Sequence, residues 1–86
     1  MARTVYITFP NIHSAMQAES LLSGGPWRVR LLPVPRIISA SCGMAMRCPS
    51  EDAGAVSSFL EEESVPVEGQ YELDGDVLLS CRPEGG

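Results

Sequence analysis

The stretch Thr4-Val5-Tyr6-Ile7-Thr8-Phe9-Pro10-Asn11 decides the fold, because a strand pattern gives way to a helix start within it. Apolar residues alternate with the others from Thr4 to Phe9, which is typical of a strand with one buried face. Pro10 ends this strand. Asn11 can cap a helix through its side-chain oxygen, and Ser14 is a second candidate for the cap.

A helix is expected from Ile12 onward, because the apolar residues then follow a helical spacing. Its expected apolar stripe consists of Ile12, Ala15, Met16, Ala18, Leu21 and Leu22. The segment Ser23-Gly24-Gly25-Pro26 stops this helix, with glycine at its C-terminal end. A strand followed directly by a helix is the first of two such units in the chain.

The second unit follows the same plan. Alternation predicts a strand over Trp27–Leu31, which Pro33 and Pro35 close, and another over Gly43–Cys48. Ser50 is the expected cap of a second helix, with acidic residues in its first turn. The expected apolar stripe of this helix is Ala53, Val56, Phe59 and Leu60, and a fourth strand is expected over Val67–Leu73.

The order β-α-β-β-α-β predicts an α+β fold of the ferredoxin-like kind. We expect an antiparallel sheet of order 4-1-3-2 with both helices on one face. Asp74-Gly75 lies between apolar runs and is typical of a hairpin turn. Val77–Cys81 is therefore expected as an extra edge strand beside the fourth strand. Residues 82–86 are expected to be a frayed end. The prediction is one domain over 1–86, with a core at 4–73 and a C-terminal extension at 74–86.

Charge and composition exclude several classes of function. The formal net charge is -5, which argues against nucleic acid and against an anionic membrane surface as partners. The basic residues nevertheless gather around the middle of the chain, where Arg28, Arg30, Arg36 and Arg47 flank one loop. No apolar run approaches the about 20 residues that span a bilayer, and the N-terminus has no signal-peptide core. A cytoplasmic protein is therefore expected.

Three cysteines, Cys42, Cys48 and Cys81, occur without a C-x-x-C pair. An odd number of thiols in a reducing compartment argues against a disulfide framework, and the spacing does not fit a zinc or thioredoxin-like site. We therefore expect no metal and no cofactor. Cys48 would lie roughly 17–20 Å from Cys42 along an extended strand. Its place on the strand face of Met44 and Met46 favours a core residue over a resolving thiol.

The loop Arg36–Gly43 is the candidate site, because it places the Cys42 thiol directly before a glycine. Gly43 lets the backbone turn and leaves space beside the sulfur. In the expected topology this loop lies at the same end of the sheet as the first helix N-terminus, whose partial positive charge stabilises a thiolate. Arg36 would act in the same direction, and His13 could donate to the sulfur or shuttle its proton.

Simpler interpretations stand beside this one. A cysteine before glycine is often only a small turn residue, a histidine near a helix start is often a surface or capping residue, and Arg36 could be a solvated charge. The position of Cys81 stays open. No Ser/His/Asp set, phosphate-binding loop or carboxylate pair appears in the sequence.

Longer motifs add a family resemblance. The chain contains Ile7-Thr8-Phe9-Pro10, then His13, then Pro33-x-Pro35-Arg36-x-Ile38-Ser39-x-Ser41-Cys42-Gly43-Met44-Ala45-Met46-Arg47. From about Val5 to about Leu73 it resembles the small bacterial family called Se/S carrier-like, formerly a domain of unknown function (DUF3343). The resemblance implies that Cys42 bears sulfur or selenium as a persulfide or selenosulfide. It also implies partners such as a cysteine-desulfurase-like donor or a TusA-like protein.

Three functional hypotheses follow. The first is a carrier that is not an enzyme, in which Cys42 accepts the cargo and passes it on by exchange. The second is a ferredoxin-like regulatory or protein-interaction module without thiol chemistry. The third uses Gly85-Gly86 as a C-terminal thiocarboxylate, although carriers of that kind have a β-grasp order that this chain lacks. The sequence does not decide whether the cargo is sulfur or selenium. It also leaves open whether the protein forms a homodimer.

Overall fold

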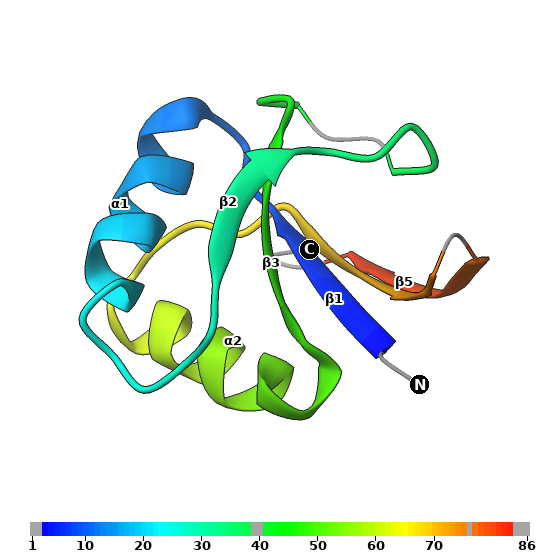
Figure 1. Cartoon of the computed structure of the whole chain (residues 1–86). Helices are drawn as coiled ribbons and strands as arrows, with labels where there is room; N and C mark the ends of the chain where they lie inside the picture. Colours follow the sequence, from blue (N-terminus) through cyan, green and yellow to red (C-terminus); the bar gives the residue numbers. More distant parts are fainter. Residues whose placement is uncertain (1–2, 39–40, 76, 84–86) are drawn as a thin grey trace.

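The computed structural model describes residues 3–38, 41–75 and 77–83. Five strands, two α-helices and one short 3₁₀ helix follow one another along this part of the chain (Figure 1). In chain order they are β1 (Arg3–Thr8), α1 (Ile12–Leu22), β2 (Arg30–Pro33), β3 (Met44–Pro49), the 3₁₀ helix η1 (Ser50–Asp52), α2 (Ala53–Glu62), β4 (Gly69–Asp74) and β5 (Val77–Pro83).

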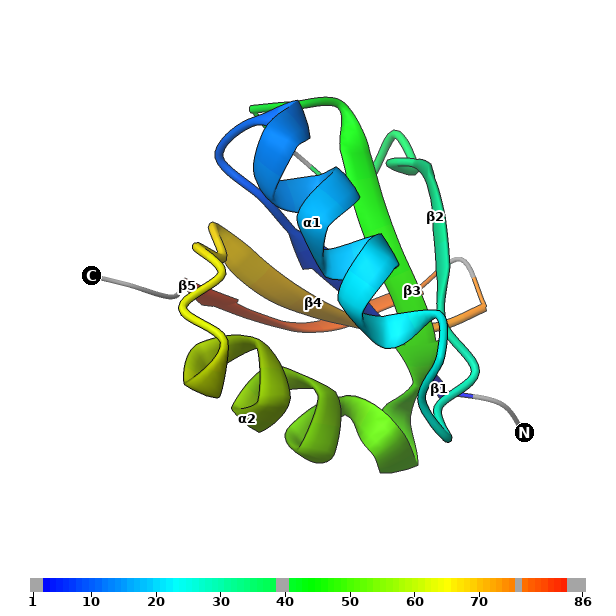
Figure 2. The ribbon, with the colours of Figure 1, turned by 90° about the vertical axis from the view of Figure 1, so that its left-hand side faces the viewer.

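The strands form one sheet of order β2-β3-β1-β4-β5, in which every neighbouring pair is antiparallel. Both helices lie on the same side of this sheet (Figures 1 and 2). The predicted α+β class is therefore confirmed. The sheet has a fifth strand outside the four-stranded order, which is the expected extra edge strand β5 beside β4, and it extends to Pro83 rather than Cys81. Arg82 and Pro83 thus belong to a strand, and 84–86 of the expected frayed end lie outside the described residues.

The core lies between the helices and the sheet, and β1 is at its centre because it pairs with strands on both sides. Alternate residues of β1 and β3 face this core, as their spacing predicts. Small residues on the helices allow a close approach to the strands. The buried core cluster consists of Val5, Ile7, Phe9, Ala15, Ala18, Leu22, Met46, Cys48, Ala53, Val56, Leu60 and Val65.

Helix α1 begins as the sequence predicts but faces the core differently. Asn11 is its cap, since the Asn11 Oδ1 accepts a hydrogen bond from the backbone N–H of Ser14 at 2.9 Å. Ile12 and Met16 were expected on the buried stripe, but they are 44% and 58% exposed. At 3.6 residues per turn they point away from the side that holds Ala15, Ala18 and Leu22, so the stripe is narrower than expected.

Strand β2 begins later than expected. Trp27 precedes it, packs against the core cluster and places its ring 5.3 Å from that of Phe59 on α2. Pro33 lies inside the strand rather than after it. A proline is tolerated there because β2 is an edge strand, with one side unpaired.

The start of α2 also differs from the prediction. Ser50 does not cap the helix but opens the 3₁₀ turn, and its hydroxyl donates to the Glu72 carboxylate at 2.8 Å. Asp52 precedes α2 without a side-chain capping bond. Strand β4 begins at Gly69, two residues later than expected.

The sheet face away from the helices is only partly open. Ala45 and Leu73 alternate with core-facing residues and so belong to this second face, yet both are buried. Residues 34–38, which follow β2, extend to this side of the sheet (Figure 1). Within that segment Ile38 is also buried. The described part of the candidate loop therefore includes a residue that is buried against the rest of the molecule.

Candidate functional site

The strand register fixes the place of Cys42 in the molecule. Thr8, the last residue of β1, pairs with Ala45 near the start of β3. Cys42 precedes Ala45 by three residues, and α1 begins four residues after Thr8. The thiol therefore lies at the end of the sheet where α1 begins, and Figure 1 shows the start of α1 at the top. The topology predicted from the sequence places Cys42 at this same end of the sheet.

The Cys42 side chain is half-buried and packs against the core cluster. Its thiol is free and donates a hydrogen bond to the backbone carbonyl of Met44, with 3.3 Å between Sγ and the oxygen. A half-buried thiol keeps some access to solvent, while the hydrogen bond gives it a defined orientation. Because a thiolate cannot donate, this bond has to break before the sulfur acts as a nucleophile.

Gly43 is needed for the shape of the backbone. Its φ is +75°, in the left-handed region that residues with a Cβ rarely adopt. Apart from its two chain neighbours, no atom lies within 4 Å of a Cβ built at this position. The reversal of the chain between Cys42 and β3 therefore requires this glycine, and the space that it leaves beside the sulfur stays a prediction.

Glu68 is the residue of this site that the sequence did not suggest. Both of its carboxylate oxygens accept hydrogen bonds from Ser41, one from the backbone N–H at 2.9 Å and one from the hydroxyl. Its own N–H donates to the Thr8 carbonyl at 2.7 Å. The turn before Cys42 is thus tied to the start of β4 and the end of β1. The two hydrogen bonds from Ser41, the one from its hydroxyl first, lower the pKa of Glu68 because they favour the ionised carboxylate.

Of the two other predicted site residues, His13 lies at the end of the sheet where α1 begins, whereas Arg36 lines a pocket toward the far end of β4. His13 is an exposed residue in the first turn of α1. Arg36 is exposed and lines a pocket of about 360 Å³ together with Tyr6 and Leu73, on the face away from the helices. Cys42 packs on the opposite, helix-facing side. No described contact joins either side chain to the Cys42 sulfur, so their proposed roles stay predictions.

Cys48 has the surroundings of a structural residue. Its side chain is 1% exposed within the core cluster. Burial raises the pKa of the Cys48 thiol to about 11, and the negative charge of Asp52 acts in the same direction. This agrees with the core position that the strand pattern indicates. Of Cys81 only the backbone, in β5, lies within the described residues.

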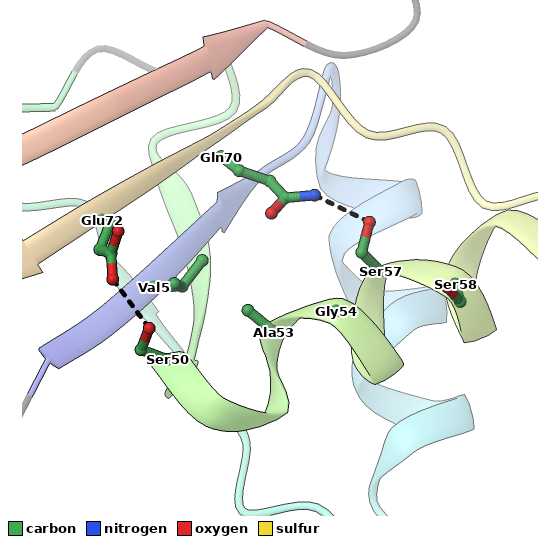
Figure 3. A pocket seen from close by; sticks show the side chains of 8 residues that line it. All are labelled: Val5, Ser50, Ala53, Gly54, Ser57, Ser58, Gln70 and Glu72. Atoms are coloured by element: carbon green, nitrogen blue, oxygen red, sulfur yellow. Dashed lines mark hydrogen bonds between the residues drawn. The ribbon is translucent and has the colours of Figure 1, made fainter.

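A separate pocket of about 410 Å³ lies between α2 and the sheet (Figure 3). Two hydrogen bonds lie at this pocket. Gln70 Nε2 donates to the Ser57 hydroxyl at 2.8 Å, and the Ser50 hydroxyl donates to Glu72. These bonds join α2 and η1 to β4 through polar groups where apolar packing would be usual. Because its principal polar groups already bind one another, the pocket has a structural explanation, and none of the predicted site residues lines it.

Neither a metal site nor a membrane-spanning helix is found in the part of the chain that the structure describes. Within the described ranges no three His, Cys, Asp or Glu side chains come together in a way that could hold a metal ion. The helices in those ranges are too short or too polar to cross a bilayer. Cys42, with its turn and the Glu68 anchor, remains the main chemical feature of this end of the sheet.

The comparisons with known proteins give one match. No curated protein and no solved structure matches the chain. Residues 4–72 match the family described as "Putative Se/S carrier protein-like", and this range includes Cys42, its turn and Glu68. The resemblance inferred from the sequence motifs is thereby confirmed. Since the match covers β1 to β4 and both helices, the chain belongs to this Se/S carrier-like family.

Proposed function

We propose that the protein is a sulfur or selenium carrier that holds its cargo on Cys42 and catalyses no reaction of its own. One observation supports this most directly. Within the segment matched by the family, Cys42 is a free, half-buried thiol on a turn at one end of the sheet. The other described cysteine, Cys48, is sealed in the core. A partner thiol can reach Cys42 with only a local movement of the turn.

The chemistry is thiol exchange with a donor persulfide. The Cys42 thiolate attacks the outer sulfur of the donor group R–S–SH and forms a new S–S bond. The bond between the two donor sulfurs breaks, the donor leaves as the thiolate R–S⁻, and Cys42 becomes Cys42–S–SH. The proton released by Cys42 passes to solvent or to a base. With selenium, the donor is R–S–SeH and Cys42 carries a selenosulfide.

The surroundings of Cys42 have distinct roles in this proposal. The bond from Ser41 to Glu68 keeps the turn in one shape, while breakage of the hydrogen bond to Met44 frees the sulfur. The first turn of α1 stabilises negative charge at this end of the sheet. Arg36 and His13 remain candidates for charge stabilisation and proton transfer when a partner reorders the turn.

The partners proposed for this cycle are those that the family implies. A cysteine-desulfurase-like protein would supply the cargo, and a TusA-like protein would be one exchange partner. Both exchanges suit a cytoplasmic location, where thiols stay reduced. The acidic net charge of the chain favours a partner with a basic surface around its own cysteine.

Cargo loading tests the proposal. The reduced protein is incubated with a cysteine desulfurase and cysteine, and its intact mass is measured without reductant. We expect one added sulfur atom on the unmodified chain and on Cys48→Ala, and none on Cys42→Ser. An adduct of equal amount on Cys42→Ser would contradict the proposal.

A second candidate is a ferredoxin-like regulatory or interaction module in which Cys42 has no transfer chemistry. The hydrogen bond to Met44 and the packing against the core cluster favour it, because both suit a structural thiol. Alkylation by iodoacetamide at neutral pH separates the two. A Cys42 rate well above that of free cysteine supports the carrier, whereas a slower rate supports the module.

A further inference from the structure

Arginines gather at the end of the sheet opposite Cys42. The chain has six basic residues and a formal net charge of -5. Four of the six line one pocket of about 350 Å³, and no acidic residue is among the described residues that line it. The pocket lining consists of Arg3, Thr4, Arg28, Val29, Arg30, Arg47, Cys48 and Pro49. We call this the arginine pocket.

The sheet topology assembles this pocket. Arg3 opens β1 and Arg30 opens β2, while Arg47 lies near the end of β3. Because β3 is antiparallel to both neighbours, the end of β3 meets the starts of β1 and β2. Arg28 adds a fourth guanidinium from the segment before β2. The sequence places Arg28, Arg30 and Arg47 on either side of the Cys42 loop, but the fold brings them to the far end, with Arg3 and without Arg36.

The pairing of Arg30 with Arg47 is unfavourable by itself. These residues are directly opposite each other on adjacent strands, where like charges destabilise a sheet. Asp74 on β4 lies directly opposite Arg3 on β1, so one of the four arginines has an acidic neighbour. Among the described residues no ion pair joins a carboxylate to Arg28, Arg30 or Arg47. A bound anion would offset the repulsion and satisfy several guanidinium donors at once.

We propose that the arginine pocket binds a small phosphate monoester. A doubly charged phosphate matches several guanidinium groups better than a single carboxylate does, and guanidinium binds phosphate oxygens in pairs. Val29 and Pro49, with the aliphatic stems of the arginines, provide apolar contact for the organic part of the ester. The volume of about 350 Å³ is in the range of small-ligand sites.

This site is separate from the thiol. Cys42 precedes β3 and the arginine pocket lies at the end of β3, so the two are roughly 17 Å or more apart along an extended strand. The phosphate site therefore does not depend on the proposed carrier function. Either can fail without the other, because sulfur loading and phosphate binding are measured on different residues.

The test is an NMR titration of the ¹⁵N-labelled full chain at low ionic strength with phenyl phosphate, inorganic phosphate and phenol. We expect saturable shifts for phenyl phosphate at residues 3–4, 28–30 and 47–49, weaker binding of inorganic phosphate, and none of phenol. The double variant Arg30→Gln/Arg47→Gln should bind phenyl phosphate about tenfold more weakly or worse. The matched control Arg36→Gln, an arginine outside the pocket, should bind within about twofold of the original chain.

Several results would overturn the proposal. These are the absence of saturable shifts, an equal loss in Arg36→Gln, or binding of a single-stranded RNA oligonucleotide without binding of phenyl phosphate. The double variant should fold, since it removes a repulsion, and its amide spectrum shows whether it does. If it does not fold, the double variant Arg3→Gln/Arg28→Gln replaces it, because this variant changes neither member of the opposed pair. It should also bind phenyl phosphate about tenfold more weakly or worse.

Discussion

At the scale of single residues, the turn before Cys42 depends on a carboxylate 27 positions away in the sequence. Glu68 holds Ser41 through two hydrogen bonds, so the position of the thiol is set partly by the start of β4. A charged acceptor makes these bonds stronger than neutral ones, although solvent weakens them at an exposed site. This places a negative group close to the turn, where the sequence suggested only positive ones.

Glu68→Gln should destabilise the protein by about 0.5–1 kcal/mol at pH 7, because it removes the charged acceptor of an exposed pair. The folded state lowers the pKa of Glu68, so this contribution is present above the usual carboxyl pKa and is lost as the pH falls through the lowered one. Urea unfolding of both proteins from pH 7 to pH 3 checks this. A stability difference that stays constant down to pH 3 would exclude the ionised carboxylate as its source.

Cys48 makes a prediction for alkaline pH. The folded state raises its pKa to about 11, whereas an exposed thiol titrates at about 8.5. The stability linked to the neutral thiol is therefore complete below about 8.5 and declines as the pH rises toward 11. The difference in unfolding free energy between the original chain and Cys48→Ala should shrink over this window in reversible denaturation. A difference that does not change with pH would contradict the burial of this thiol.

The sequence was informative about Cys42 and silent about Glu68. A thiol, a glycine and a loop are adjacent in the chain, so their association is local and can be inferred. The bond from Ser41 to Glu68 joins distant segments, and a glutamate before a strand has no pattern that distinguishes it from a solvated one. Arg36 was assigned to the thiol because it is near in sequence; the structure places it beside a pocket with Tyr6 and Leu73, and its role at the thiol stays a prediction.

At the scale of elements, the strands and helices followed from periodicity, while their ends depended on contacts that the periodicity does not contain. Asn11 was predictable as a cap because its partner, the N–H of Ser14, is three residues away. Ser50 has the same cap chemistry but bonds to Glu72 on β4. Trp27 fits a strand pattern, but its packing against Phe59 keeps it outside β2.

Substitution of two glycines by alanine, one in the turn and one in α2, should change the stability in opposite directions. Gly43→Ala should cost about 1–2 kcal/mol, because its φ of +75° strains any residue with a Cβ. Gly54→Ala should stabilise by up to about 1 kcal/mol, since Gly54 lies in α2 and an added Cβ meets no atom within 4 Å. Thermal or urea unfolding measures both. Equal effects of the two substitutions would contradict the assigned backbone conformations.

The opposed arginines of β2 and β3 predict a gain in stability when one is neutralised. Arg30→Gln should raise the unfolding free energy by about 0.2–1 kcal/mol at low salt, because it removes a like-charge pair from adjacent strands. The gain should shrink in about 1 M salt, where screening is strong. Destabilisation by Arg30→Gln at low salt and without a ligand would show that Arg30 makes a favourable contact instead.

At the scale of the whole molecule, the family match ends shortly before the added edge strand of the sheet begins. The match ends at residue 72, within β4, and β5 follows as an added edge strand. Cys42 and α1 occupy one end of the sheet, and the arginine pocket occupies the other. A small domain can thus present two chemically different ends, and none of the described side chains of β5 belongs to either end.

Truncation tests this division. A chain that ends at Asp74 lacks β5 and should remain folded but less stable, because β4 becomes an edge and Leu73 loses cover. Its cargo loading at Cys42 should be unchanged, and it also lacks Gly85-Gly86. Circular dichroism and intact mass measure these outcomes. Loss of loading in a folded truncated chain would favour the thiocarboxylate hypothesis over Cys42.

The most direct measurement of the central claim is the location of the cargo on the intact chain. The protein is loaded by a desulfurase and cysteine, trapped with an alkylating reagent and digested, and its peptides are sequenced by mass spectrometry. The account predicts the additional sulfur on Cys42, and its loss after a chase with the reduced thiol of an acceptor protein. Additional sulfur on Cys48, on Cys81 or on the carboxylate of Gly86, with Cys42 unmodified, would contradict it.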